Sequence, residues 1–205
     1  MKIHLGCGTK KLEGWVNIDS VPHCQPDLVH DLSKPLPYPD LAVEEIMAHG
    51  VLEHFDKYMR YVVLGDWARV LKVGGLLHLE LPDFKKLLFR YFKFEFDDLV
   101  DTLFGENLWE SKIYIGHFGN HKWGYSQKSL EKFTRQFGLE PVSIVTKGLN
   151  IRYTGRKVKH VSSEEMDQWL IHSHNNKFGP HPADMPLGTV KQRIKEFGDK
   201  SHEQR

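Results

Sequence analysis

The sequence predicts an α/β fold built on a doubly wound, mostly parallel sheet, and three observations lead to this expectation. An apolar run at residues 2–5 breaks into a glycine turn, as a buried strand does where a ligand lies against bare backbone. Residues 44–49 and 76–81 are typical of strands, and apolar residues at helical spacing over 56–71 separate them. Two strand-like runs within residues 139–158 predict an antiparallel hairpin at the sheet edge. This alternation of elements predicts helices on both faces of the sheet.

The first connections of the sheet are expected to be shorter than usual. Only residues 10–14 separate the glycine turn from the next strand, whereas a parallel crossover normally needs about 10 to 12 residues. Pro22 and Pro26 interrupt the following connection, so a full helix is not expected there either. Further on, Lys72-Val73-Gly74-Gly75 is predicted to end the helix, with glycine in the left-handed capping position.

The chain is expected to form one domain, residues 1–160, followed by a helical or partly disordered extension, residues 161–205. The extension is expected to be loosely attached because most of it is polar, charged and interrupted by proline. Within the domain, residues 84–103 are predicted to be helical, and residues 104–125 are predicted to form an ordered aromatic loop over the site or, alternatively, to pack as core. Ser126 supplies a hydroxyl cap for the next helix.

Composition excludes several classes of protein. The chain carries 28 Lys and Arg against 27 Asp and Glu, a formal charge of +1, so no global field would hold nucleic acid or an anionic membrane, and neither is expected as a partner. Two cysteines argue against a disulfide-stabilised secreted domain. No run approaches the roughly 18 apolar residues of a membrane span, and the first strand begins too early for a signal peptide. The expected location is therefore cytoplasmic.

A local basic stretch near the end of the domain has two interpretations. It contains Arg152, Arg156, Lys157, Lys159 and His160. It could bind a phosphate-bearing substrate or RNA, or it could be an edge strand whose lysines deter aggregation. The edge strand is the interpretation that we favour.

A ligand site is predicted where the first two strands end. Gly6-Cys7-Gly8 follows the first strand, and the second strand ends at Asp19. Glycines that admit a ligand, paired with a carboxylate that accepts hydrogen bonds from ribose hydroxyls, indicate a nucleotide-type site. The alternative for Asp19, and more strongly for Asp31, is that the carboxylate caps a turn.

The ordered set formed by Gly6-Cys7-Gly8, Asp19, Asp31 and the segments 50–54 and 71–75 resembles class I S-adenosylmethionine-dependent methyltransferases, most of all the type-11 methyltransferase group. The similarity covers residues 2 to 158 and implies a seven-stranded, Rossmann-like sheet. In that family the glycine turn wraps the methionine half of the cofactor, the acid after the second strand binds ribose, the acid after the third lies beside the adenine, and the end of the fourth strand faces the methyl donor. The cofactor-binding residues that the resemblance implies are Leu5, Gly6, Cys7, Gly8, Asp19, Ser20, Asp31, Leu32, His49 and Gly50.

Three positions depart from the family pattern. His4, Lys10 and Val73 stand where an acid, a third glycine and a proline are usual. The first two departures motivate an alternative to an enzyme, which is a module that binds the cofactor without turnover.

Histidines are the candidate catalytic residues. His54, just past the fourth strand, would lie near the methyl group, where a neutral imidazole can take the proton of an acceptor hydroxyl near pH 7. His117 and His121 are further candidates. The alternatives are that His54 caps or packs the following helix and that the other two lie in a surface loop among aromatic side chains.

No metal ligand is expected from the sequence. A zinc site built from His4, Cys7, His23 and Cys24 would lack the close cysteine pair of structural zinc sites. Cys7 is interpreted as a small packing residue under the cofactor rather than as a nucleophile.

The sequence therefore predicts an S-adenosylmethionine-dependent methyltransferase that acts on a small-molecule or saccharide-type acceptor at oxygen. Proximity and desolvation would supply most of the catalysis. Besides the binding module, an NAD(P)-dependent oxidoreductase is a third possibility, because the same sheet supports that chemistry.

Overall fold

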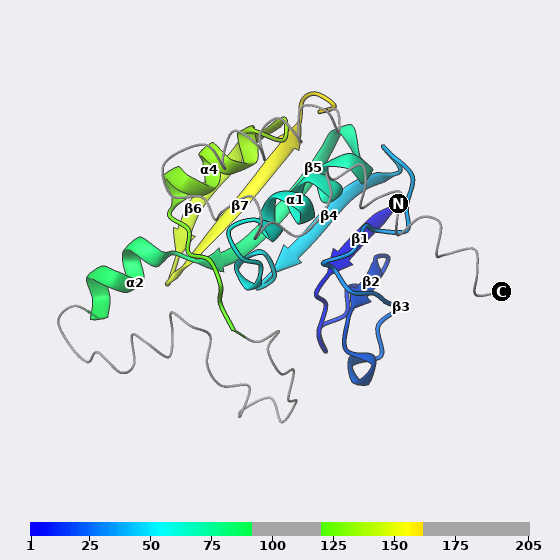
Figure 1. Ribbon diagram of the computed structural model, residues 1–205, viewed down its shortest axis with the longest axis horizontal. Coiled ribbons are helices and arrows are strands. Elements are labelled where there is room, and N and C mark those ends of the chain that lie inside the picture. The colour runs from blue at the N-terminus through cyan, green and yellow to red at the C-terminus, as the bar shows by residue number, and fades with distance from the viewer. Residues whose placement is uncertain (92–119, 162–205) are drawn as a thin grey trace, which may run out of the picture.

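Seven strands form one mixed sheet in the computed structural model, which describes residues 1–91 and 120–161 (Figure 1). The strands are β1 (Lys2–Leu5), β2 (Val16–Asp19), β3 (Leu28–Val29), β4 (Val43–His49), β5 (Leu71–Pro82), β6 (Leu139–Lys147) and β7 (Asn150–Lys157). The helices are α1 (Met59–Val70), α2 (Phe84–Tyr91) and α4 (Gln127–Arg135), with short 3-10 helices η1 (Pro22–Cys24) and η2 (Leu52–His54).

The strand order is β3-β2-β1-β4-β5-β7-β6. The first five strands pair in parallel, and β7 runs antiparallel to both β5 and β6. The chain moves outward from β1 to β3 and then returns to the other side of β1, so the topological switch point lies between β1 and β4. The predicted fold class, with its mostly parallel sheet, shortened first crossovers and antiparallel C-terminal hairpin, is confirmed.

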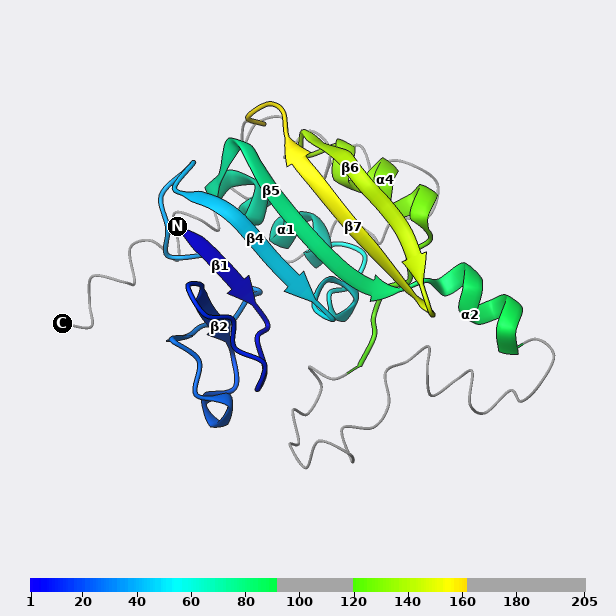
Figure 2. The same cartoon turned by 180° about the vertical axis from the view of Figure 1, so that it is seen from behind.

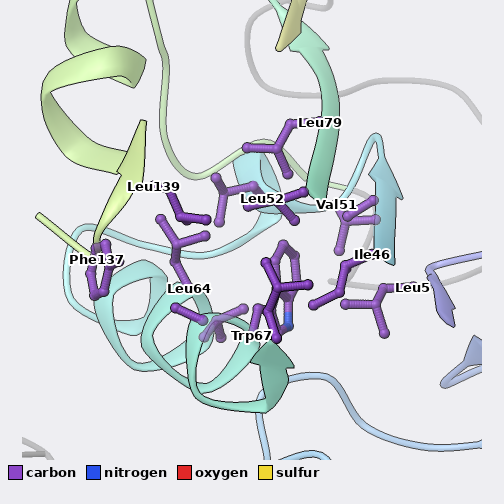
Figure 3. Packing of buried hydrophobic residues seen from close by; sticks show 14 of the residues in the cluster. Leu5, Ile46, Val51, Leu52, Leu64, Trp67, Leu79, Phe137 and Leu139 are labelled. Atoms are coloured by element: carbon purple, nitrogen blue, oxygen red, sulfur yellow. The ribbon is translucent and has the colours of Figure 1, made fainter. Parts of the chain in front are cut away.

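One apolar layer lies between the sheet and the helices. Trp67 of α1 is 1 % exposed and lies against Ile46 and Leu79 of the central strands, while Phe137 and Leu139 extend the layer beside α1 (Figure 3). Every second residue of the central strands enters this layer, as the period of two in a strand requires. This packing fixes α1, and with it the segment that leads from β4 into α1.

The expectation of helices on both faces is wrong for the part of the chain that the structure describes. Helices α1 and α4 lie on the same side of the sheet, and Figure 2 shows no described helix across the opposite face. The connections that leave β1, β2 and β3 contain only turns and η1, since they are short or interrupted by proline. These three connections therefore supply no α-helix to that face.

The helix-free face is polar and internally paired. His78 of β5 lies 2.9 Å from Oε1 of Glu45 and 3.0 Å from the Thr154 hydroxyl, and Glu80 pairs with Arg152 at 2.9 Å. The alternation Leu77-His78-Leu79-Glu80-Leu81 matches this arrangement, because one side of each strand faces the core and the other faces solvent.

Gly74 and Gly75 do not cap α1, which corrects the expectation that they end the helix. The helix stops at Val70, and its C-cap residue Leu71 is already extended at φ −73° and ψ 132°. Gly74, at φ +88°, lies inside β5, where the register to β4 shifts. The left-handed glycine thus serves a strand irregularity instead of a helix end.

The basic stretch does not belong to an edge strand. β7 lies between β5 and β6, and the edge strands of the described sheet are β3 and β6. Lys157 is 1 % exposed and its ammonium donates to the carbonyls of Ala68 and Leu71 at 2.5 and 2.7 Å, so it satisfies the C-terminus of α1. The guanidinium of Arg156 instead donates a hydrogen bond to the carbonyl of Gly74.

Several expectations lie partly or wholly outside the described residues. They include the helices beyond Tyr91, most of the aromatic loop with His117, and the extension after Val161. Ser126 does cap α4, through a reciprocal pair of hydrogen bonds with Ser129. None of the described helices has both the length and the apolar character needed to cross a membrane.

Candidate functional site

A cavity of about 550 Å³ opens at the carboxyl ends of the parallel strands. Its lining includes Gly6 after β1, Asp19 at the end of β2, Asp31 after β3 and Gly50 after β4. Ligands of open α/β sheets bind at this edge, beside the switch point, and the volume lies within the usual range of about 300–1,000 Å³ for ligand sites. We refer to it as the first cavity.

The glycine turn after β1 is shaped by two left-handed residues. Gly6 has φ +63° and Gly8 has φ +51°. A Cβ atom at Gly6 would overlap Cγ2 of Val51, whereas a Cβ at Gly8 would meet no described atom within 4 Å. The first glycine is therefore needed for contact with the segment after β4, and the second leaves open space beside the backbone.

Asp19 joins the glycine turn to the end of β2. Its Oδ2 accepts a 2.8 Å hydrogen bond from the Gly8 amide, and its Oδ1 accepts a 2.9 Å bond from the Val21 amide. Each carboxylate oxygen can accept a second hydrogen bond, so the side chain can hold the turn and still receive hydroxyl donors from a ligand.

Asp31 also forms a turn and lines the cavity. Its Oδ1 accepts hydrogen bonds from the amide and hydroxyl of Ser33, at 2.9 and 2.7 Å. The turn interpretation is therefore confirmed, while the ligand interpretation stays a prediction for a side chain that also lines the cavity. Ser20 and Leu32 line the same cavity.

Two of the residues implied by the resemblance do not line the first cavity. Leu5 is fully buried in the apolar core. His49 lines a second cavity, of about 740 Å³, together with His4, His78, Glu80 and other residues of the helix-free side. Burial lowers the pKa of the His49 imidazole, and the neighbouring Glu80 carboxylate raises it in part.

Cys7 is a buried thiol with no reactive character. It is 3 % exposed, and burial, reinforced by the negative charge of Asp19, raises its pKa to about 11. Nucleophilic cysteines have the opposite shift, because the thiolate is the reactive form.

Glu53, His54 and His121 form a cluster after β4. The rings of His54 and His121 have centroids 5.0 Å apart, and His54 lines the first cavity. Burial, and then the charge of His121, lower the pKa of His54 to about 4. Glu53 is 3 % exposed, and burial raises its pKa to about 8. Sequence reasoning singled out both histidines but missed Glu53, although it precedes His54 directly.

The segment that carries His121 is fixed against η2 and α1. The amides of Lys122 and Trp123 donate to the main-chain carbonyl of Glu53 at 2.7 and 3.1 Å. The guanidinium carbon of Arg60 in α1 lies 4.3 Å from the ring centroids of both Trp123 and Phe133. These contacts bring His54 and His121, which are 67 positions apart in the chain, into one site.

The fold is shared with solved structures of S-adenosylmethionine-dependent methyltransferases. No protein-family model and no curated protein matches the sequence. Solved structures do match. A methyltransferase from Methanosarcina mazei is 14 % identical, with a TM-score of 0.55 over 77 % of this chain and 92 % of its own.

Two further structures agree. A methyltransferase from Clostridium acetobutylicum is 14 % identical, with a TM-score of 0.53 over 76 % of this chain and 82 % of its own. The 1,6-didemethyltoxoflavin-N1-methyltransferase of Burkholderia thailandensis, solved with bound 1,6-didemethyltoxoflavin and S-adenosylhomocysteine, is 12 % identical, with a TM-score of 0.52 over 77 % of this chain and 71 % of its own. At these identities the likeness establishes the fold.

Proposed function

We propose that this protein is an S-adenosylmethionine-dependent methyltransferase whose cofactor occupies the first cavity. The observation that carries the proposal is the joint presence of the Gly6–Gly8 turn, Asp19 and Asp31 around one cavity at the switch point. The open backbone at Gly8 would receive the methionine half, Asp19 the ribose hydroxyls, and Asp31 and Leu32 the adenine.

Two observations favour this cofactor over a nicotinamide dinucleotide. A dinucleotide site uses the N-terminus of the helix after β1 to bind the pyrophosphate, but here turns and coil fill the connection from β1 to β2. The sheet also carries the antiparallel β7 between β5 and β6, whereas the dinucleotide-binding sheet has the order 3-2-1-4-5-6. S-adenosylmethionine has no pyrophosphate, so its binding does not require the N-terminus of a helix after β1.

The proposed reaction is a displacement at the sulfonium methyl group of the cofactor. An oxygen lone pair of the acceptor forms the new carbon–oxygen bond as the carbon–sulfur bond breaks. The bonding pair stays on sulfur, which becomes the neutral thioether of S-adenosylhomocysteine, and the hydroxyl proton leaves to solvent or a nearby base. The protein's main contribution is to align the two reactants and exclude water.

His54 is proposed to act on the acceptor, since it borders the first cavity just after β4. Its imidazole is neutral at pH 7, but a pKa of about 4 makes it a weak proton acceptor. The acceptor is proposed to be a small hydroxylated molecule or a saccharide. Lys122, Asp56 and Phe55 give the outer cavity the mixture of polar and apolar groups that such ligands need.

Ligand binding and turnover are tested separately. Thermal melts with S-adenosylhomocysteine and with NAD should show stabilisation by the first ligand alone, because a ligand of the native state raises its melting temperature. Stabilisation by NAD alone would refute the cofactor assignment. Radiolabelled methyl transfer to a panel of hydroxylated small molecules and saccharides then tests activity, with His54→Ala expected to lose turnover while retaining S-adenosylhomocysteine binding. Binding with no transfer to any acceptor would indicate a module without turnover.

A further inference from the structure

Glu53, His54 and His121 present one carboxylate and two imidazoles to a common point. Their ligand atoms all lie within 4.8 Å of one another. We propose that these three side chains bind a divalent transition-metal ion, of the type of Zn²⁺ or Mn²⁺, at the carboxyl end of β4. The proposal replaces the expectation from the sequence that the protein has no metal ligand.

An independent feature of the cluster is the unpaired oxygen of Glu53. The side chain is 3 % exposed, and its Oε2 has no hydrogen-bond partner among the described residues. A buried acceptor without a partner costs about 1–3 kcal/mol, and more when it is charged. A cation between the carboxylate and the two imidazoles would remove that cost, because buried charges in proteins are paired or coordinate metals.

The spacing suits a metal after a small contraction. A metal bound to nitrogen and oxygen at about 2.0–2.2 Å keeps tetrahedral ligand atoms about 3.4 Å apart. The ligand atoms, which lie within 4.8 Å of one another, would therefore approach by up to about 1.4 Å. The flanking main chain is already fixed, since the amides of Lys122 and Trp123 donate to the Glu53 carbonyl.

The surroundings of His54 also match those of metal-binding histidines. Its Nδ1 lies 3.1 Å from the carbonyl oxygen of Asn120. In the tautomer that donates from Nδ1, the lone pair is on Nε2, and a carbonyl partner of this kind orients the imidazoles that bind metals. The neighbouring ring of His121 comes from a segment 67 positions away.

The donor set selects the kind of ion. Imidazole nitrogen suits Zn²⁺ and the other later first-row metals, and the carboxylate also admits Mn²⁺, whereas Mg²⁺ and Ca²⁺ prefer sites made of oxygen. Three protein ligands leave at least one coordination position open, as in catalytic zinc sites.

The place of the cluster suggests what the open position holds, an inference that rests on the proposed function. His54 borders the first cavity, and Glu53 borders the second. A hydroxyl oxygen of the acceptor that coordinates the metal would lie beside the cofactor pocket. The metal would lower the pKa of that hydroxyl, so its proton would leave to solvent before the oxygen attacks the methyl carbon.

The experiment is a metal titration of the tag-free, chelator-stripped full chain, followed by isothermal calorimetry. Zn²⁺ and Mn²⁺ should bind with one equivalent, and Mg²⁺ should bind far more weakly. Glu53→Gln and His121→Ala should each weaken Zn²⁺ binding by about 10-fold or more, since even outer partners of metal ligands contribute about 10–100-fold. His23→Ala, an exposed histidine of η1, is the matched control and should bind as the unmodified chain does.

Two readouts separate this site from the alternatives. The Co²⁺ form should show visible d–d bands without a thiolate charge-transfer band, because neither cysteine is a ligand. Melts recorded without metal check that the variants fold, and Glu53→Gln is close to isosteric. Equal Zn²⁺ affinity in the chain and in the Glu53→Gln/His121→Ala double variant would overturn the proposal, and so would a thiolate band. Titration with S-adenosylhomocysteine is scored independently, so metal binding without cofactor binding would refute the proposed function and leave the metal site standing.

Discussion

The two glycines of the turn after β1 should respond differently to the same substitution. Both have positive φ, so alanine at either position incurs the left-handed penalty of about 1–2 kcal/mol. At Gly6 the new methyl also overlaps Cγ2 of Val51, which is 7 % exposed and part of the core. Overpacking of this kind costs about 1–3 kcal/mol more. We therefore expect Gly6→Ala to lower the free energy of unfolding by about 2–5 kcal/mol, and Gly8→Ala by about 1–2 kcal/mol.

The affinity for S-adenosylhomocysteine should not follow the order of stability of Gly6→Ala and Gly8→Ala. The methyl of Gly8→Ala has no described neighbour within 4 Å and enters the first cavity. Gly8→Ala should thus incur only the left-handed penalty in folding but bind S-adenosylhomocysteine at least about 10-fold more weakly, a loss of about 1.4 kcal/mol.

Urea unfolding followed by tryptophan fluorescence measures the first effect, and calorimetry with S-adenosylhomocysteine measures the second. The double variant Gly6→Ala/Val51→Ala removes the overlapping methyl, so its loss of stability should be smaller than the sum of the two single losses. Equal stability of Gly6→Ala and Gly8→Ala, or strictly additive losses in the double variant, would refute the steric argument.

Three further perturbations test other parts of the structure. Lys157→Met removes the donor to two carbonyls at the end of α1 and should lower the free energy of unfolding by about 2–3 kcal/mol in urea titrations, with an unchanged stability contradicting the capping role. Burial alone would raise the pKa of Glu45, but hydrogen bonds from Lys2 and His78 outweigh it and hold the pKa below its usual value. The contribution of this carboxylate to the free energy of unfolding is then present above about pH 4.5 and lost at lower pH. Glu45→Gln should therefore reduce the fall in the free energy of unfolding at acid pH, by less than about 1 kcal/mol. A steeper fall in the variant would contradict the lowered pKa of Glu45. Cys7, with its pKa raised to about 11, should react with Ellman's reagent at pH 8 about 200-fold more slowly in the native chain than in urea, and fast native labelling would show a reactive thiolate.

The parts of the fold that the sequence predicted well are those set by local chemistry. Ser126 and Ser129 can cap a helix without help from distant residues, and the α4 start follows from them. The turn at Gly148, with φ +62°, joins β6 and β7 as its composition implies. The glycines and the carboxylate of the site could also be predicted from local sequence, because a residue with positive φ at the end of a strand has few structural roles.

The misplaced elements are those where one residue type serves two purposes. Positive φ at Gly74 suits a helix cap and a strand irregularity equally well, and only the pairing of β5 with β4 decides between them. The apolar–polar alternation over β5 indicates one solvated face, whereas the alternation of strands and helices along the chain predicts two covered faces, and the described residues follow the first pattern. The contact of His54 with His121 is a tertiary property, since 67 residues separate them.

The missing helix after β1 also explains why Asp19 is so strongly tied to the turn. In a sheet with a full first crossover, helix packing holds the glycine turn in place. Here the turn is held by hydrogen bonds, from Gly8 to the Asp19 carboxylate and from Cys7 to the Ile18 carbonyl. The carboxylate that we propose to bind ribose is therefore the group that also supports the turn. Under the proposed function, loss of this carboxylate would disturb the turn that receives the methionine half of the cofactor as well as the group that receives the ribose, so the short crossover would couple two parts of the proposed site that a longer one would keep independent.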